Sequence, residues 1–457
     1  MVWPLVVLVG PVLLEQFLAL AVGFVDKWLA GNLFSGAESL AAIGLVAYSL
    51  AFLPVLFVAP AAAATALVAR SVGSGELAVA RRVAAQCFLV TAILSVVAVV
   101  AAALGGTRFV AVLGLPAGSS ELAVRYLAIV LPALPLMAGI QVGVAVLRGA
   151  GNMIAGLITM SVVNLVNAGA SFVLVTGSLG TVPLGWEGLA WGTVVGYGCG
   201  MLVLVSLFVF RGRGLRPAAE DWVPAAGVVR RIGRVGMPAG IDAVGNAACH
   251  LTFLGIVNRL GDVDAAAHAV AITIESLAFL PGSAFQVAAA TLSGQFLGAR
   301  DERRARGSVW LAALAAAGLM SAVGLGFLVA AEPLAEWFTG GAGSQPVVAA
   351  RAADLVRIVA FAQPSLALLM VLSGGLRGAG ATRPPLIVNF LGLTVVRLPL
   401  AVLLAWSSIQ LPLGFGTLEG FGLGARGAWL AMAADLTARG LAMLLIFRGR
   451  SWSRVGG

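Results

Sequence analysis

Five carboxylates fall inside long apolar stretches of this chain, where an ionisable group needs a reason to be present. They are Glu15, Asp26, Asp242, Glu275 and Asp435. A charged side chain in hydrocarbon costs about 2.5–3.5 kcal/mol even on insertion scales, so such groups commonly carry protons, ions or charged solutes. Each carboxylate is therefore a candidate for proton or cation handling, and its position depends on the helix that carries it.

The first apolar stretch carries two of these acids. Glu15 and Asp26 lie 11 residues apart, which returns to within about 20° of the same helical face at a separation of roughly 16 Å. Asp26 is a candidate proton or cation carrier; the alternative is an interfacial Asp that pairs with Lys27 near the helix end. Glu15 is either a second titrating site or a charge that attracts cationic solutes to a cavity.

The second half of the chain carries the other three. Asn246 follows Asp242 by one turn, with Cys249 on the same face, and His268 and Glu275 lie seven residues apart, about 10 Å along one helical face. A His–carboxylate face can relay protons; the alternative is a His268 at the outer interface and a Glu275 that packs against polar neighbours. Asp435 and Arg439, at i and i+4, are predicted to neutralise each other, and Arg397 needs one of these carboxylates as its partner.

The composition predicts the surroundings of these residues. The chain has 457 residues, 60% of them apolar and 10% charged, against roughly 45–50% and about 25% in soluble globular proteins. It is therefore predicted to be a polytopic membrane protein. The net charge of +9 comes from basic residues between apolar runs, which favours retention of loops in the cytoplasm over nucleic-acid binding. Three scattered cysteines have no metal-ligand spacing, and no metal or organic cofactor is expected.

The apolar runs predict an all-α protein with twelve transmembrane helices. Most Lys and Arg residues fall in every second connection and at the C-terminus, which places both termini in the cytoplasm. This predicts a multi-pass protein of the cytoplasmic (inner) membrane. The helices are predicted at residues 5–29, 39–69, 83–104, 126–146, 153–177, 188–210, 236–258, 265–294, 308–331, 355–376, 384–407 and 427–447.

An internal repeat divides the helices into two sets of six. Ser-Leu-Ala-Phe-Leu-Pro occurs at Ser49–Pro54 and Ser276–Pro281, an offset of 227, and Leu-Arg-Gly-Ala-Gly occurs at Leu147–Gly151 and Leu376–Gly380, an offset of 229. We predict an N-terminal lobe (1–210), a cytoplasmic linker (211–235) and a C-terminal lobe (236–457). Because six is even, a pseudo-twofold axis along the membrane normal should relate the lobes, an arrangement suited to alternating access.

Several of these strings resemble the multidrug and toxic compound extrusion (MATE) transporters, most closely the DinF-like bacterial branch. They are Val25–Leu33, Leu40–Ala42, Ala66–Gly73 and the two Leu-Arg-Gly-Ala-Gly repeats. The resemblance covers about residues 10–450. It implies two six-helix lobes in a V shape and export of organic, often cationic, compounds in exchange for protons or sodium ions.

The resemblance also implies site residues. Asp26 matches the family's helix 1 carboxylate, Asn167 its helix 5 asparagine and Thr193 a helix 6 threonine; the alternative for the last two is interhelical hydrogen bonding, worth about 1 kcal/mol. Ser171 stands where many relatives have an aspartate, which favours a proton over sodium as the coupling ion. The NorM-like branch has acids near Asn246 and Leu366 that this chain lacks, so a NorM-type site in the C-terminal lobe is not expected, although Asp242 could substitute.

Together these observations predict a secondary active antiporter, not an enzyme. It would export organic, cationic or amphipathic compounds in exchange for protons, with sodium as the less favoured ion and membrane lipid around it, and act as a monomer. The excess of acids over bases in the predicted spans, five against Arg397 and Arg439, favours a cationic or neutral solute. The alternative is a flippase for a lipid-linked saccharide or another lipid. No hydrolase or phosphate-binding motif occurs.

Overall fold

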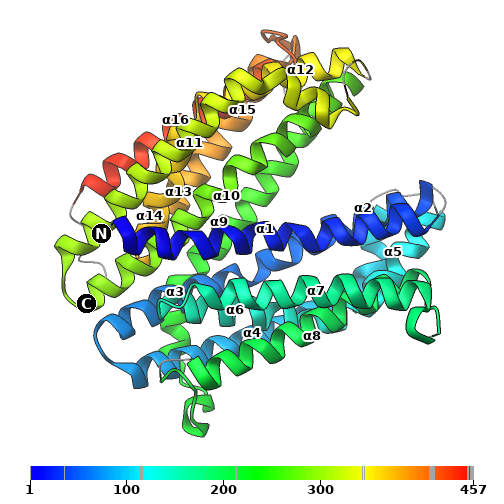
Figure 1. The fold of residues 1–457 in the computed structure, drawn as a ribbon. Coiled ribbons are helices and arrows are strands. Elements are labelled where there is room, and N and C mark those ends of the chain that lie inside the picture. Colours follow the sequence, from blue (N-terminus) through cyan, green and yellow to red (C-terminus); the bar gives the residue numbers. More distant parts are fainter. Residues whose placement is uncertain are drawn as a thin grey trace. The chain divides into compact units, whose positions relative to one another are not determined.

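The computed structural model consists almost entirely of helices (Figure 1). It describes residues 2–34, 37–112, 117–180, 182–211, 214–341, 343, 345–410, 417–449 and 452. The predicted linker 211–235 includes residues 212 and 213, which lie outside these ranges. The chain divides into two compact units: an N-terminal unit of Val6–Gly240 and Gly294–Arg300, and a C-terminal unit of Met1–Leu5, Ile241–Ser293 and Asp301–Gly457.

Within the described residues, 11 helices are long and apolar enough to cross a membrane, and a bent pair of shorter helices raises the number to 12. This confirms the predicted all-α polytopic class. The bent pair is α12 (Pro346–Ala360) and α13 (Gln363–Gly378), at 55° to each other. Proline at the start of a helix supplies no backbone N–H to the preceding turn, and Pro364 lies at this break.

The remaining elements follow in chain order. They are α1 (Val2–Leu33), α2 (Ala37–Phe52), η1 (Leu53–Phe57), α3 (Val58–Gly73), α4 (Leu77–Val112), α5 (Ala117–Val130), η2 (Leu131–Ala133), α6 (Leu134–Gly149), α7 (Ile154–Thr176), η3 (Ser178–Gly180), α8 (Trp186–Arg211), η4 (Ala219–Trp222), α9 (Ala226–Asn258), α10 (Asp262–Gly298), α11 (Glu302–Phe338), α14 (Arg383–Leu391), η5 (Gly392–Arg397), α15 (Leu398–Ala405), β1 (Ser408–Gln410), β2 (Thr417–Glu419) and α16 (Ala425–Arg448).

Prolines shape several of these helices. The predicted second span is divided into α2, η1 and α3 at Pro54, and the predicted fourth span into α5, η2 and α6 at Pro132 and Pro135. Pro11, by contrast, lies inside α1, which continues without interruption to Leu33. Neighbouring helices and polar side chains can satisfy the carbonyl that such a proline leaves free.

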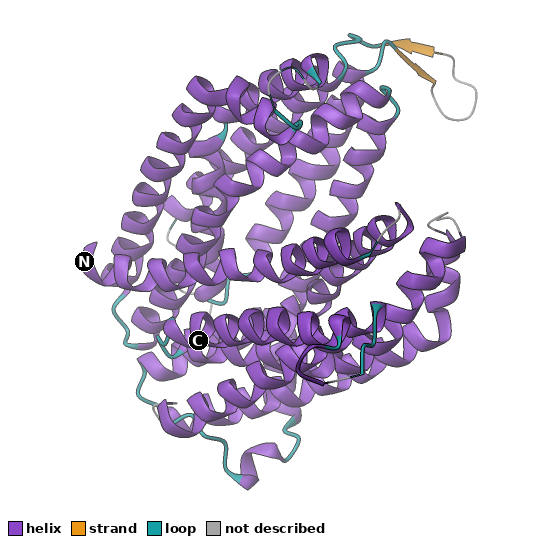
Figure 2. Cartoon of the chain, turned by 45° about the vertical axis from the view of Figure 1, so that its right-hand side comes forward, coloured by secondary structure: helices purple, strands orange, loops and turns teal. Residues whose placement is uncertain are grey.

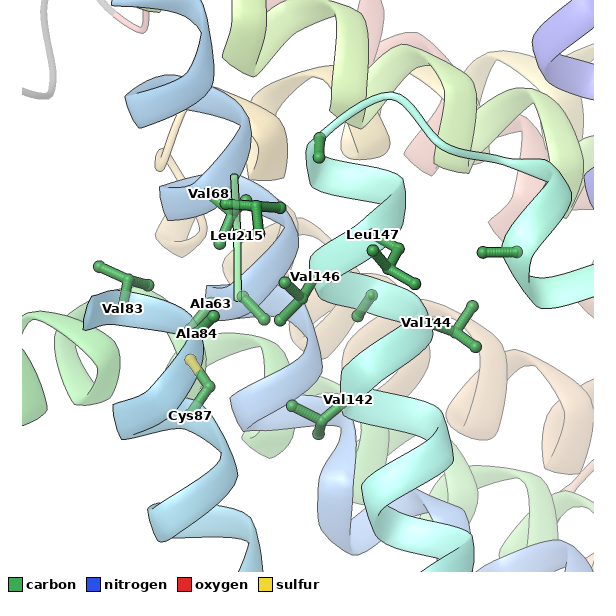
Figure 3. Close-up of a cluster of buried hydrophobic side chains, with 14 of the residues drawn as sticks. Ala63, Val68, Val83, Ala84, Cys87, Val142, Val144, Val146, Leu147 and Leu215 are labelled. Carbon is green, nitrogen blue, oxygen red and sulfur yellow. The ribbon is translucent and has the colours of Figure 1, made fainter. Parts of the chain in front are cut away.

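The core of the N-terminal unit is made of small and β-branched side chains. Its largest cluster joins α3, α4 and α6, with Ala63, Val68, Ala84, Val142 and Val146 all fully buried (Figure 3). Small residues let helix backbones approach closely, which is how helices associate without a hydrophobic driving force between them. A second cluster, around Tyr126 and Trp186, joins α1, α2, α5 and α8. It lies around the candidate site described below.

In the C-terminal unit, α11, α13 and α16 pack together around buried alanines such as Ala312, Ala316 and Ala428. A short antiparallel hairpin, β1–β2, follows α15, with Ile409 opposite Leu418. Its two strands lie at one end of the helices of this unit (Figure 2). This hairpin supplies the only strands among the described residues.

Candidate functional site

Asp26 lies in the interior of the N-terminal unit, and neutral groups surround it. Its side chain is 4% exposed. Tyr126 Oη and Thr193 Oγ1 donate hydrogen bonds to Oδ2 over 2.8 and 3.1 Å, and Asn167 Nδ2 donates to Oδ1 over 3.4 Å. Within the described ranges no Lys, Arg or His forms an ion pair with this carboxylate. The structure therefore places Asp26 away from the pairing with Lys27 that was the alternative interpretation.

The three donors also contact one another. Tyr126 Oη lies 3.0 Å from Thr193 Oγ1, and Asn167 Nδ2 lies 3.1 Å from the same oxygen. Ser171 Oγ accepts a longer hydrogen bond of 3.5 Å from Asn167 Nδ2 and donates one of 3.5 Å to the Leu189 carbonyl. All of these side chains are buried. The predicted site residues Asp26, Asn167, Thr193 and Ser171 thus form one cluster.

Glycines on α8 bring this cluster together. A Cβ on Gly192 would lie 2.0 Å from Ser171 Oγ, and one on Gly196 would lie 2.8 Å from the Val163 carbonyl. A larger residue at either position would push α7 and α8 apart. The close approach lets Asn167 and Ser171 on α7 reach Thr193 on α8, while α1 supplies Asp26 and α5 supplies the tyrosine.

One polar atom of the cluster has no partner in the described part of the chain. Asn167 Oδ1 is buried without a hydrogen bond. A buried acceptor that is left unsatisfied costs about 1–3 kcal/mol. Because the amide oxygen and nitrogen exchange places by a half-turn of the side chain, Asn167 can present either a donor or an acceptor to Asp26. This suits a carboxyl group that alternates between ionised and protonated states.

Glu15 does not join this cluster. It is 7% exposed and forms a 2.6 Å ion pair with Arg148, in the last turn of α6. Gly156 on α7 makes room for the pair, because a Cβ there would lie 2.1 Å from Glu15 Oε2. Nearby, Asn164 Nδ2 donates to the Leu18 carbonyl over 2.9 Å. Glu15 and Asp26 lie on one helix, but only Asp26 lacks a cationic partner.

The C-terminal unit repeats this ion pair. Asp242 accepts hydrogen bonds from Arg377, in the last turn of α13, and from Asn389 Nδ2 over 3.0 Å. Asp242 lies 227 residues after Glu15, and Arg377 lies 229 residues after Arg148, the same offsets that relate the repeated strings. Each unit therefore ties its first long helix to the helix that ends in Leu-Arg-Gly-Ala-Gly.

The ionic network of the C-terminal unit extends beyond this pair. Arg439 donates to Asn389 Oδ1 over 3.1 Å and pairs with Asp435 over 2.6 Å. Arg397 Nε also pairs with Asp435, over 2.9 Å. The predicted neutralisation of Asp435 by Arg439 is confirmed, and Asp435 is the carboxylate partner expected for Arg397. A π-helical turn, η5, carries Arg397 into this position.

The other sequence-based candidates lie apart from Asp26. Asn246 is exposed, and the described residues give it no bond to Asp242. Glu275 is half-buried, and its side chain forms no hydrogen bond with another described residue. Arg397 interacts with it electrostatically. His268 is buried and accepts a 3.1 Å hydrogen bond from the Trp429 indole, a structural contact. No described group of three or more His, Cys, Asp or Glu side chains could hold a metal ion.

Sequence reasoning missed four members of these networks: Tyr126, Arg148, Arg377 and Asn389. The two arginines lay in predicted cytoplasmic connections, whereas both belong to helix ends and pair with acids. Four arginines, and not two, therefore pair with members of the set of five acids. The signal was available, because Arg148 and Arg377 occupy the same place in a repeated string, just as Glu15 and Asp242 are equivalent positions of the repeat.

Comparisons with known proteins agree with this architecture. The MatE family model matches residues 11–173 and 238–403. A protein described as a probable multidrug resistance protein NorM, from Thermotoga maritima, is 27% identical over 98% of this chain and 93% of its own length.

Solved structures match at the level of the fold. The MATE transporter VcmN of Vibrio cholerae, in its bent form, gives a TM-score of 0.86 at 20% identity, covering 99% of this chain and 96% of that one. A MOP superfamily transporter from Pyrococcus furiosus gives a TM-score of 0.85 at 19% identity, covering 97% and 94%.

Proposed function

Because this chain belongs to the MatE family of membrane transporters, we propose that it is a proton-coupled antiporter that exports organic compounds by alternating access. The observation that carries the proposal is the setting of Asp26: a buried carboxylate held only by neutral donors. A charge in such a place must be neutralised by a proton or by a cation. Asp26 can take up and release a proton without breaking an ion pair.

Protonation of Asp26 would rearrange its neighbours. The ionised carboxylate accepts from Tyr126, Thr193 and Asn167, which together bring α5, α7 and α8 against α1. A protonated carboxyl must donate one hydrogen bond, so one donor has to turn away or, like Asn167, present its oxygen. One proton therefore changes the contacts among four helices, which is the coupling an antiporter needs.

The solute is proposed to be cationic or amphipathic. The relative from Thermotoga maritima is described as a probable multidrug resistance protein, which supports a broad organic substrate class. Glu15, Asp242 and Asp435 are paired with arginines, and Glu275 interacts electrostatically with Arg397, so the support from charge rests on Asp26. In this proposal a proton and a cationic solute compete for the charge of that carboxylate.

We propose a proton and not sodium as the coupling ion. Apart from the Asp26 carboxylate, the described cluster contains only neutral groups. They are the Asn167 amide and the hydroxyls of Ser171, Thr193 and Tyr126. A second carboxylate at position 171 would favour a hard cation, and this chain lacks it. The transporter would need no other cofactor and would act as a monomer in the cytoplasmic membrane, with both termini in the cytoplasm.

The test is uptake of ethidium into proteoliposomes that contain the purified protein. With an acidic lumen and no sodium, the wild type should accumulate dye as protons leave, and Asp26→Asn should not. The matched control is Glu332→Gln, which removes an exposed carboxylate on α11 and should keep wild-type uptake.

Two results would overturn parts of the proposal. Uptake driven by a sodium gradient at equal pH, and not by the acidic lumen, would show that sodium is the coupling ion. No dye uptake under either gradient, with movement of a fluorescent lipid-linked saccharide between leaflets, would show a flippase.

A further inference from the structure

Two cavities of opposite character adjoin at one end of the C-terminal unit. The first, of about 760 Å³, is an apolar groove between α9 and α15, lined by side chains such as Ile256, Leu398 and Val402. The second, of about 700 Å³, is polar and is lined by Ser407, Ser408 and Asp264, among others. Both volumes fall in the range of small-molecule sites, about 300–1,000 Å³. A ligand that filled both would need an apolar part and a polar part.

Arg259 and Trp406 form the wall that the two cavities share. The guanidinium carbon of Arg259 lies 5.6 Å from the centre of the Trp406 ring, and the indole N–H donates to the Ile256 carbonyl over 3.3 Å. Stacking of a cation on an aromatic face is stabilising. The indole is thus fixed to α9, and it holds the positive charge where the apolar groove meets the polar cavity.

This positive charge has no carboxylate partner in the described ranges. The nearby acid of the polar cavity, Asp264, is taken by Arg351 over 2.8 Å and by the Ala425 N–H over 3.1 Å. The hydroxyls of Ser407 and Ser408 have no recorded hydrogen bond within the same ranges. A free cation beside two free hydroxyls is suited to a phosphate group.

The position of the wall matches the edge of a membrane. The spans of α9 and α15 end at Asn258 and Ala405, and Arg259 and Trp406 follow directly. Tryptophan and arginine at such positions commonly lie at the level of lipid headgroups. The apolar groove therefore runs from this level along the spans, toward the hydrocarbon.

We propose that this pair of cavities binds an anionic phospholipid, with an acyl chain in the groove and its phosphate at Arg259. A headgroup with a net negative charge complements the unpaired guanidinium. A zwitterionic headgroup carries its own cation and would complement it less well. The site is separate from Asp26 and does not depend on the proposed antiport.

Native mass spectrometry of the delipidated full-length protein tests the site. Dioleoylphosphatidylglycerol and dioleoylphosphatidylcholine are added at equal concentration, and the ratio of the two bound lipids is measured. The wild type should prefer phosphatidylglycerol, and Arg259→Gln should lower that preference about fivefold, which is the effect of one basic residue near an anionic lipid surface. Arg125→Gln, which removes an exposed charge from the N-terminal unit, should leave it unchanged.

A second pair of variants tests the groove itself. Gly255 lines the groove, and a Cβ there meets nothing within 4 Å, so Gly255→Leu should fill it and lower retention of both lipids. Gly245 on the same helix has equally open surroundings and lines neither cavity. Gly245→Leu is the matched control and should retain lipid as the wild type does.

Three outcomes would overturn the assignment. They are an unchanged lipid preference in Arg259→Gln, unchanged retention in Gly255→Leu, and displacement of phosphatidylglycerol by free glycerol phosphate at equal concentration. The last would show that a soluble anion, and not a lipid, occupies the polar cavity.

Discussion

The two units carry the same ion pair but differ in what else they bury. In the N-terminal unit, Glu15 is paired with Arg148, and Asp26 is left with neutral donors alone. In the C-terminal unit, the residue 227 positions after Asp26 is Phe253, which is 1% exposed. Tyr126 likewise corresponds, 229 positions on, to Leu355. The repeat has thus kept the ion pair in both units and the isolated acid in one.

Charge balance follows the same division. Asp242, Asp435 and Glu275 lie among Arg377, Arg397 and Arg439, so the network of the C-terminal unit balances three acids with three bases. Asp26 has no such balance within its unit. A buried network that is already neutral has no need of a mobile proton, whereas an isolated acid does. In the proposed mechanism, the N-terminal unit is therefore the one whose charge changes during transport.

The largest expected effect is on stability, and it separates the two kinds of acid. Asp435→Asn leaves Arg397 and Arg439 without their carboxylate, and breaking a buried pair in this way costs about 3–5 kcal/mol. Asp26→Asn breaks no ion pair and should cost less, at most about the 1.5–3 kcal/mol of a hydrogen bond to a charged group. Thermal unfolding in detergent measures both. Equal losses in the two variants would contradict the comparison.

A smaller effect is expected at the repeated ion pair. Arg148→Gln and Arg377→Gln should each cost about 1–3 kcal/mol, because a buried carboxylate loses its charged hydrogen-bond partner. The arginine side chains are 15% and 23% exposed, so water limits the loss. A double-mutant cycle of Glu15→Gln with Arg148→Gln isolates the pairwise term. A coupling energy near zero would show that the pair does not join α1 to α6.

Next in size is the loss of one neutral donor. Tyr126→Phe removes the 2.8 Å hydrogen bond to Asp26, and hydrogen bonds to charged groups contribute about 1.5–3 kcal/mol. We expect at least about a tenfold fall in proton-driven ethidium uptake, since about 1.4 kcal/mol corresponds to tenfold. Ser206→Ala, which removes an exposed hydroxyl that donates to the Leu202 carbonyl within α8, is the control. Wild-type uptake in Tyr126→Phe would show that α5 does not take part in the coupling.

The smallest effect is expected at Ser171. Its hydroxyl makes only 3.5 Å contacts, to Asn167 Nδ2 and the Leu189 carbonyl, and such long hydrogen bonds are weak. Ser171→Ala should lower initial rates of uptake by less than about threefold, the effect of a weak neutral hydrogen bond. A loss as large as that of Asp26→Asn would show that Ser171 is a direct ligand of the coupling ion.

The sequence was sufficient for the class of protein and for one cluster. Hydropathy located the spans, and the resemblance to the MATE transporters indicated Asp26, Asn167 and Thr193, which the fold brings together. The partner of Arg397 followed from the rarity of charges in hydrocarbon. These inferences use features that lie along the chain and do not require knowledge of which helices are neighbours.

Contacts between distant helices were harder to predict. Tyr126 reaches Asp26 only because α5 packs beside α1, and nothing in its own helix marks it. Arg148 and Arg377 were assigned to connections because charge in a sequence suggests a loop, although each extends back to a buried acid. Asn389 joins Asp242 to Arg439 across three helices, and no linear pattern indicates such a bridge.

The most direct test of the central claim, that Asp26 exchanges its proton for the solute, is proton release on binding. Ethidium is added to the purified protein in weakly buffered detergent solution, and a pH-sensitive dye reports the protons released per dye bound. The measurement is made in a pH range where Asp26 is protonated before dye is added. We expect the wild type to release close to one proton per bound dye and Asp26→Asn to release none. Equal release from the two proteins would contradict the claim and would assign the coupling proton to another group.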